Sequence, residues 1–97
     1  MTDRLIWALR QAILKDFLPM AGVPITAAEF VDIAPNILIR QNPEQALTEI
    51  NELKLMAYLT PLAGWDGKYL TISATGIRQC KPEYPKERFI YGPMAEV

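Results

Sequence analysis

The sequence contains no histidine and only one cysteine, Cys80. Without histidine, neither the Ser-His-Asp nor the Cys-His arrangement for nucleophilic catalysis can form. The same shortage excludes a structural zinc site of cysteine and histidine ligands, so we expect no bound metal. A single cysteine also excludes a disulfide within the chain, which is typical of proteins from the reducing cytoplasm. We therefore expect a cytoplasmic protein without metal chemistry.

The chain also lacks a long apolar run and a surplus of positive charge. No stretch approaches the roughly 20 apolar residues that a membrane-spanning helix requires, and charged residues interrupt the apolar runs near the N-terminus. We expect no membrane partner and no signal peptide. The formal net charge is −1, whereas nucleic-acid-binding domains usually carry a basic surplus that neutralises phosphates. The chain has no such global surplus, and a local basic patch is the form of DNA-binding surface that its charge still allows.

The length of 97 residues, 51% of them hydrophobic, suits one small folded domain, which we place at residues 1–80. Residues 81–97 combine three prolines with three aromatic residues, which are Pro82, Pro85, Pro93, Tyr84, Phe89 and Tyr91. This segment is too proline-rich for a helix and too aromatic for an ordinary disordered tail. We expect an extended arm that packs either on its own domain or on a partner.

The first helix is predicted over residues 3–18, with Thr2 as its N-cap and Pro19 as its stop. At about 100° per residue, its core face consists of Leu5, Ile6, Leu9, Ala12, Ile13 and Phe17. The opposite side carries four polar or charged residues, which are Arg4, Arg10, Gln11 and Lys15.

That opposite side also carries a second apolar stripe of Trp7, Leu14 and Leu18. The surface helix of a monomer needs only one apolar stripe. Either the C-terminal arm covers the stripe, or the stripe packs on a second copy of the chain in a homodimer. In the second case Trp7 is the aromatic anchor, and Phe89 and Tyr91 are further interface candidates.

A second helix is expected from Thr26 to about residue 34, because Thr26 and Glu29 match the capping box. Four of its residues are available for the core, namely Phe30, Val31, Ile33 and Ala34. The short segment 23–25 before this helix is expected to be extended. Residues 37–41 form an apolar link to the next helix, for which a single helical turn and a buried bend are both consistent.

A third helix is predicted over residues 43–54, with Asn42 as its N-cap and Gln45 at the capping-box position. Its core face is Ala46, Leu47, Ile50 and Leu53, and its outer face is Glu44, Gln45, Thr48, Asn51 and Glu52. A β-hairpin is predicted over residues 56–72, because Asp66-Gly67 is a strong signal for a tight turn. Ser73 or Thr75 is expected to cap a short helix after it.

Five short segments, taken in this order, carry a resemblance to a known domain type: residues 25–30, 46–53, 54–59, 66–72 and 75–77. Together they resemble the winged helix-turn-helix domain of prokaryotic transcription regulators. The resemblance implies an α+β, mainly helical fold, with a three-helix core and a C-terminal β-hairpin wing. The sequence departs from the pattern in its long apolar link, in the lack of a glycine after the third helix, and in that helix's acidic charge.

In winged helices that bind DNA, the third helix enters the major groove and the wing touches the backbone. The resemblance therefore implies a small DNA-binding protein, a dimeric transcriptional regulator of double-stranded DNA, acting through helix 43–54 and wing 56–72. The candidate contacts are Arg40, Gln41, Gln45, Thr48, Asn51, Lys54, Lys68 and Tyr69. Gln45, Thr48 and Asn51 are chemically able to read base edges. Glu44, Glu49 and Glu52 oppose phosphate binding, because like charges repel at close range.

Two other functions are consistent with the same sequence. The domain is alternatively a protein–protein interaction module without DNA binding, in which the outer face of helix 43–54 is only solvated surface. Enzymatic activity is not expected, because the carboxylates fall into no recognisable catalytic spacing and no glycine-rich phosphate loop is present. For the same reason we expect no cofactor.

Overall fold

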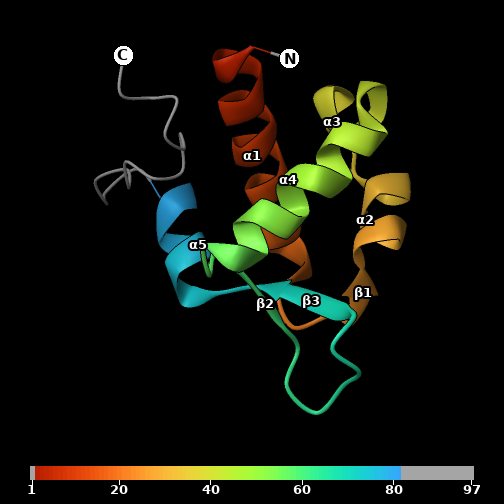
Figure 1. Ribbon diagram of the computed structural model, residues 1–97. Helices are drawn as coiled ribbons and strands as arrows, with labels where there is room; N and C mark the ends of the chain where they lie inside the picture. The colour runs from red at the N-terminus through yellow and green to blue at the C-terminus, as the bar shows by residue number, and fades with distance from the viewer. Residues whose placement is uncertain (1, 82–97) are drawn as a thin grey trace.

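A computed structural model describes residues 2–81, so the arm residues Phe89 and Tyr91 lie outside the described part. Its elements are α1 (Asp3–Phe17), the 3-10 helix η1 (Leu18–Met20), β1 (Ile25–Thr26), α2 (Ala27–Ile33), α3 (Ile37–Gln41), α4 (Pro43–Leu55), β2 (Leu59–Pro61), β3 (Tyr69–Ile72) and α5 (Ala74–Cys80). The described part is therefore α+β and mainly helical, as expected (Figure 1). None of these helices is long and apolar enough to cross a membrane.

The three strands form one antiparallel sheet in the order β1-β3-β2, at one end of the helices (Figure 1). Ile25 of β1 pairs with Leu70 of β3, and Leu59 of β2 pairs with Ile72. All four side chains are buried, so the sheet closes the helical core from below. Burial alternates along β3, in which Leu70 and Ile72 are buried and the residues before each of them are half-buried. Of the segment 23–25 that is expected to be extended, Ile25 belongs to the edge strand β1.

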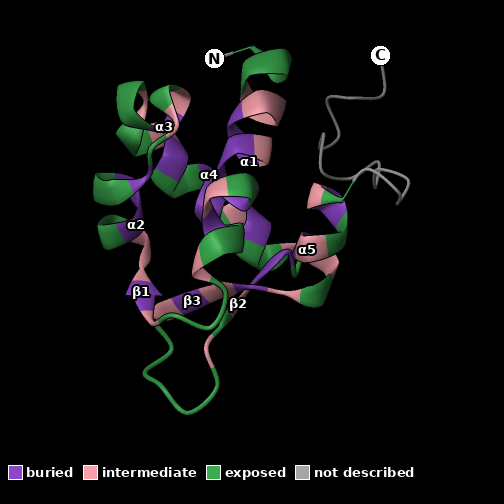
Figure 2. Cartoon of the chain, turned by 180° about the vertical axis from the view of Figure 1, so that it is seen from behind, coloured by how far each residue is buried: buried purple, intermediate pink, exposed green. Residues whose placement is uncertain are grey.

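Helix α1 begins at the predicted cap, where the hydroxyl of Thr2 accepts a hydrogen bond from the N–H of Leu5 at 3.3 Å. The burial of its predicted core face is confirmed for four residues, which are Leu9, Ala12, Ile13 and Phe17. Leu5 is 43% exposed, because it lies in the first turn beyond the packed part of the helix. Phe17 stacks on Phe30 of α2 with ring centroids 3.9 Å apart. Figure 2 shows the buried residues gathered where the helices face one another.

The second stripe of α1 is not a continuous exposed surface. Leu14 is completely buried and Trp7 is partly buried against the core, while Leu18 is 36% exposed. Helix α5 packs along α1 on this side, and its residues Ile77 and Cys80 are partly buried in the same cluster. The burial of Leu14 within the chain removes it from the candidate dimer contacts.

The capping box of α2 is present in full. The N–H of Glu29 donates to the hydroxyl of Thr26 at 3.2 Å, and the N–H of Thr26 donates to the Glu29 carboxylate at 3.0 Å. Three of the four predicted core residues of this segment are buried, but Ile33 is 60% exposed. The apolar link is a single short helix, α3, which Asn36 caps by accepting from the N–H of Leu38 at 2.9 Å.

The predicted start of α4 is right in position but wrong in its hydrogen bonds. The side chain of Asn42 makes no capping bond and instead donates to the carbonyl of Leu38 at 2.9 Å, which closes α3. Gln45 does not reach back to the cap, because its amide donates to Glu49. Leu47, predicted for the core face, is 40% exposed. Both polar side chains therefore serve partners outside the predicted cap.

The hairpin is wider than the Asp66-Gly67 signal predicts. Strand β2 is limited to Leu59–Pro61, and residues 62–68 form a loop before β3. The left-handed glycine of this loop is Gly64, with φ of +82°, and Asp66 closes a local turn by accepting from the N–H of Lys68 at 3.2 Å. Residue Ala57, placed in the first strand by the sequence pattern, has a φ of +66° in the turn after α4.

The start of α5 is tied tightly to the turn that precedes β2. Ser73 is the N-cap, accepting from the N–H of Gly76 at 3.1 Å, and its N–H donates to the carbonyl of Tyr58 at 3.0 Å. A Cβ atom on Gly76 would collide with that same carbonyl and lie 2.7 Å from Cγ1 of Ile72. Glycine is therefore required here by close packing.

Substituting Gly76 by alanine tests this packing. We expect Gly76→Ala to lower the free energy of unfolding by about 1–3 kcal/mol, because the added methyl overpacks the contact with backbone. Gly67→Ala is the matched control, since open space surrounds Gly67, and it should change stability by less than about 0.5 kcal/mol. Urea unfolding of both variants and the wild type measures these free energies. Equal free energies of unfolding for the two variants would show that α5 can shift to accommodate the methyl group.

Candidate functional site

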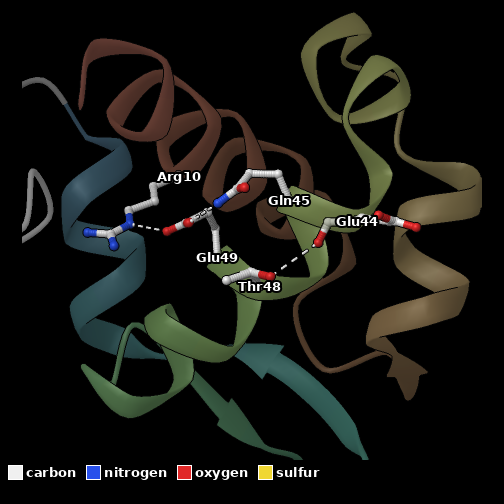
Figure 3. A network of polar contacts seen from close by, with 5 residues as sticks. All are labelled: Arg10, Glu44, Gln45, Thr48 and Glu49. Atoms are coloured by element: carbon white, nitrogen blue, oxygen red, sulfur yellow. Dashed lines mark hydrogen bonds and ion pairs between the residues drawn. The ribbon is translucent and has the colours of Figure 1, made fainter. Parts of the chain in front are cut away.

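A buried ion pair joins the two longest helices, α1 and α4. The Nε–H of Arg10 donates to Oε1 of Glu49 at 2.7 Å, and the two side chains are only 6% and 4% exposed (Figure 3). The amide of Gln45 donates to the second carboxylate oxygen, also at 2.7 Å. The sequence analysis placed Arg10 on the side of its helix away from the core and Glu49 among the glutamates that would approach phosphate, and both side chains are buried instead.

The geometry of α4 explains this correction. Glu49 follows Thr48 and precedes Ile50 at the border between the outer and core faces, where a small rotation decides whether a side chain is buried. A buried carboxylate is tolerated only when a partner and further hydrogen bonds offset its lost hydration. Arg10 and Gln45 supply both. The acidic charge of Glu49 is consequently withdrawn from the outer face of α4.

A shallow cleft of about 270 Å³ lies between α4 and the hairpin. The wall on α4 consists of Leu47, Ile50, Asn51 and Lys54, and the remaining lining residues are Ala27, Gly67, Lys68 and Leu70. Lys54 and Lys68 are both exposed and come from different elements, so two ammonium groups border one cleft. The lining includes no carboxylate within the described residues. The cleft therefore offers cations and one amide above an apolar floor.

Three of the eight predicted contact residues thus meet at the cleft: Asn51, Lys54 and Lys68. The other five are distributed elsewhere. Arg40 and Gln41 are exposed at the end of α3, and Tyr69 is half-buried in β3. Gln41 and Gln45 border a second, more open hollow at the N-terminal end of α4. The hydroxyl of Thr48 donates to the carbonyl of Glu44 at 3.3 Å (Figure 3).

The hairpin beside the cleft carries an aromatic and cationic group, in which the predicted contact residues Lys68 and Tyr69 lie near Trp65. Trp65 is 54% exposed, and its ring lies 5.4 Å from that of Tyr69 at an angle of 59°. The ammonium of Lys68 lies 5.7 Å from the centre of the Tyr69 ring. Such a cation–π contact at an exposed site contributes about 0.5–1 kcal/mol. It favours conformations that keep Lys68 near β3.

The carboxylate of Glu29 lies close enough to Lys68 for the positive charge of the lysine to affect its pKa. Its pKa lies below the ordinary value of 4.5, because the carboxylate accepts hydrogen bonds from the backbone N–H and the hydroxyl of Thr26, with a smaller contribution from the charge of Lys68. Hydrogen bonds that favour the charged form always lower a carboxyl pKa. The negative charge of Glu29 is therefore engaged at the N-terminus of its own helix, where the dipole favours it.

No protein-family model matches the chain, and comparisons with known proteins and with solved structures gave no match. Within residues 2–81, no group of three or more acidic or cysteine side chains is placed to hold a metal ion. What the cleft can do chemically follows from its own residues. Two ammonium groups favour a ligand with negative charge, and the amide of Asn51 offers one acceptor and two donor hydrogens.

Breaking the buried ion pair should be costly, whereas replacing both partners should not. We expect Glu49→Ala to destabilise the domain by about 3–5 kcal/mol, because the Arg10 charge stays buried while the carboxylate that neutralises it is removed. The double variant Arg10→Met with Glu49→Leu removes both charges and should recover most of that loss. Urea unfolding of this double variant and of the single variants Arg10→Met and Glu49→Leu gives the free energies for a double-mutant cycle. Additive losses in the cycle would contradict a coupled pair.

Glu29 should contribute an acid-sensitive part of the stability. Because its pKa is lower in the folded than in the unfolded chain, its contribution is present above pH 4.5 and is lost as pH falls through the folded pKa. NMR titration of the Glu29 carboxyl measures the shift, and Thr26→Val should move the pKa part of the way toward 4.5. Glu29→Gln should remove this portion of the pH dependence. An unshifted carboxyl in the wild type would disprove the assignment.

Proposed function

We propose that this chain is a winged-helix DNA-binding protein. Helices α1, α2 and α4 form its three-helix core, and the hairpin of β2 and β3 is its wing. Helix α4 enters the major groove, and the hairpin lies along the adjacent sugar–phosphate backbone. The observation that carries the proposal is the cleft between α4 and the hairpin, because Lys54 and Lys68 border it and would bind a phosphate of the duplex.

The electrostatics of α4 support this orientation. Three glutamates of the helix oppose phosphate binding in the sequence, but Glu49 is neutralised by Arg10 in the interior. Glu52 is half-buried, and Glu44 lies two turns or more from Lys54 at the opposite end of the helix. The wall of the cleft on α4 therefore presents Asn51 and Lys54, and Glu52 does not line it. Neutralising phosphates with lysines supplies sequence-independent affinity.

Two lysines from one chain neutralise few phosphates, and this favours action as a homodimer. A symmetric dimer presents two copies of the cleft, which doubles the cationic contacts with one duplex. A dimeric transcriptional regulator of double-stranded DNA is the role that this arrangement suits. The exposed Leu18 and the part-buried Trp7 remain available as contacts, whereas Leu14 does not.

A second function is favoured by a specific exposed surface. Ile33 at the end of α2 and Ile37 at the start of α3 are 60% and 63% exposed, and they lie close together along the chain. Exposed apolar groups of this kind are typical of protein contacts. A winged-helix interaction module that binds a protein through this surface, and binds no DNA, is the alternative.

Salt dependence separates the two functions. We expect a labelled duplex of about 20 base pairs to bind at low salt, with affinity falling steeply as salt rises. The variant Lys54→Ala with Lys68→Ala should bind more weakly to every sequence, and its slope of log affinity against log salt should be smaller by about 2. Fluorescence anisotropy between about 25 and 200 mM salt measures both quantities.

The matched control is Arg4→Ala with Arg78→Ala. This variant also loses two positive charges, but from exposed positions outside the cleft. It should therefore retain most of the wild-type affinity for DNA and most of its salt dependence. Equal effects of the two double variants would place the contact elsewhere. No binding of the wild type at low salt would reject DNA binding and leave the interaction module.

A further inference from the structure

The structure separates the three side chains of α4 that are chemically able to read bases. The amide of Gln45 donates to Glu49 at 2.7 Å and is partly buried, so it belongs to the interior network (Figure 3). The hydroxyl of Thr48 donates to the carbonyl of Glu44, which uses its one hydrogen. Asn51 is exposed, borders the cleft, and has no hydrogen-bond partner for its side chain within residues 2–81. Only Asn51 keeps its full capacity for a ligand.

Leu47 lies one helical turn before Asn51 on the same wall of the cleft. It is 40% exposed, although the spacing of apolar residues predicts it for the core. Residues four apart on a helix have side chains about 5–6 Å from each other. Stacked base pairs are about 3.4 Å apart, so the two side chains reach pairs one or two steps apart.

The chemistry of these two side chains matches one kind of base pair. The asparagine amide donates to N7 and accepts from N6–H of adenine in the major groove, and this bidentate contact fits no other base as well. An apolar side chain such as leucine contacts the C5-methyl of thymine, which distinguishes thymine from cytosine. Lys54, the remaining polar group of this wall, is a cation and therefore suits the phosphate backbone.

We propose that Asn51 and Leu47 make α4 selective for A·T base pairs, Asn51 through adenine N6 and N7 and Leu47 through the methyl of a thymine one or two steps away. This inference rests on the proposed DNA-binding function and adds its specificity. Gln45 and Thr48 are then structural side chains, despite residue types that commonly read bases. Selectivity for A·T pairs comes from two exposed residues on one turn of helix.

Selection from a library of randomised duplexes is the first test. The wild type should enrich sequences with A·T pairs at two fixed positions. Asn51→Ala should lose the preference at one position and Leu47→Ala at the other. Thr48→Ala is the matched control on the same helix and should enrich the same sequences as the wild type. A preference that is lost in Thr48→Ala but kept in Asn51→Ala would overturn the assignment.

Substituting single atoms of the enriched duplex is the second and sharper test. Replacing adenine by 7-deazaadenine removes N7, and the wild type should then bind about 3- to 30-fold more weakly, while Asn51→Ala should be insensitive. Replacing thymine by uracil removes the methyl, and the wild type should lose about 2- to 10-fold, while Leu47→Ala should be insensitive. Equal losses in wild type and variant would overturn the corresponding contact.

The outcomes distinguish this inference from the function on which it rests. Binding of the library at low salt without any enrichment would reject A·T selectivity and leave DNA binding intact. No binding of any duplex would reject both. Asn51 and Leu47 are exposed, so their variants should fold, and thermal unfolding followed by circular dichroism checks this before any affinity is compared.

Discussion

The buried contact between Arg10 and Glu49 determines which surface of α4 faces outward. It lies between the two longest helices, in a place where an unpartnered charge would cost several kcal/mol. Rotating α4 away from this position would bury a charge without its partner or expose Ile50 and Leu53. The ion pair therefore fixes the rotation of the helix about its axis. The positions of Leu47, Asn51 and Lys54 beside the hairpin follow from that rotation.

The hairpin depends on a second constraint, which lies where α5 begins. Ser73 binds the carbonyl of Tyr58 through its N–H, and Gly76 allows α5 to approach that same carbonyl. The entry to β2 and the exit from β3 are thus held at one place, next to the helical core. The loop between the strands ends at Lys68, which lines the cleft together with Lys54. Close packing at Gly76 therefore contributes to the geometry of the cleft.

Most helix caps, which depend on neighbours in sequence, were predicted correctly, with the side chain of Asn42 as an exception, whereas a pairing between distant residues was not. Thr2 and Thr26 cap their helices because a cap needs only an N–H three residues away. Glu49 was misplaced because its partner lies 39 residues earlier, and no local pattern records that pairing. The length of the hairpin loop was predicted wrongly for a similar reason. Asp66-Gly67 specifies a tight turn only where the flanking strands pair right up to it. Three candidate contacts, Asn51, Lys54 and Lys68, come together at the cleft. This grouping could not be predicted from the sequence, because it depends on how the hairpin packs beside α4.

The net charge of a chain likewise says little about its binding partners, because it does not depend on where the charged groups lie in the fold. The formal charge of −1 counts every ionised group equally, although the field over the cleft depends on where each group lies. Arg10 and Glu49 cancel each other in the interior, and Glu29 is engaged at the N-terminus of α2. Lys54 and Lys68 remain at the cleft with no carboxylate among its described lining residues. An acidic chain can in this way carry a local surface suited to an anion, so the overall charge is a weak argument against DNA.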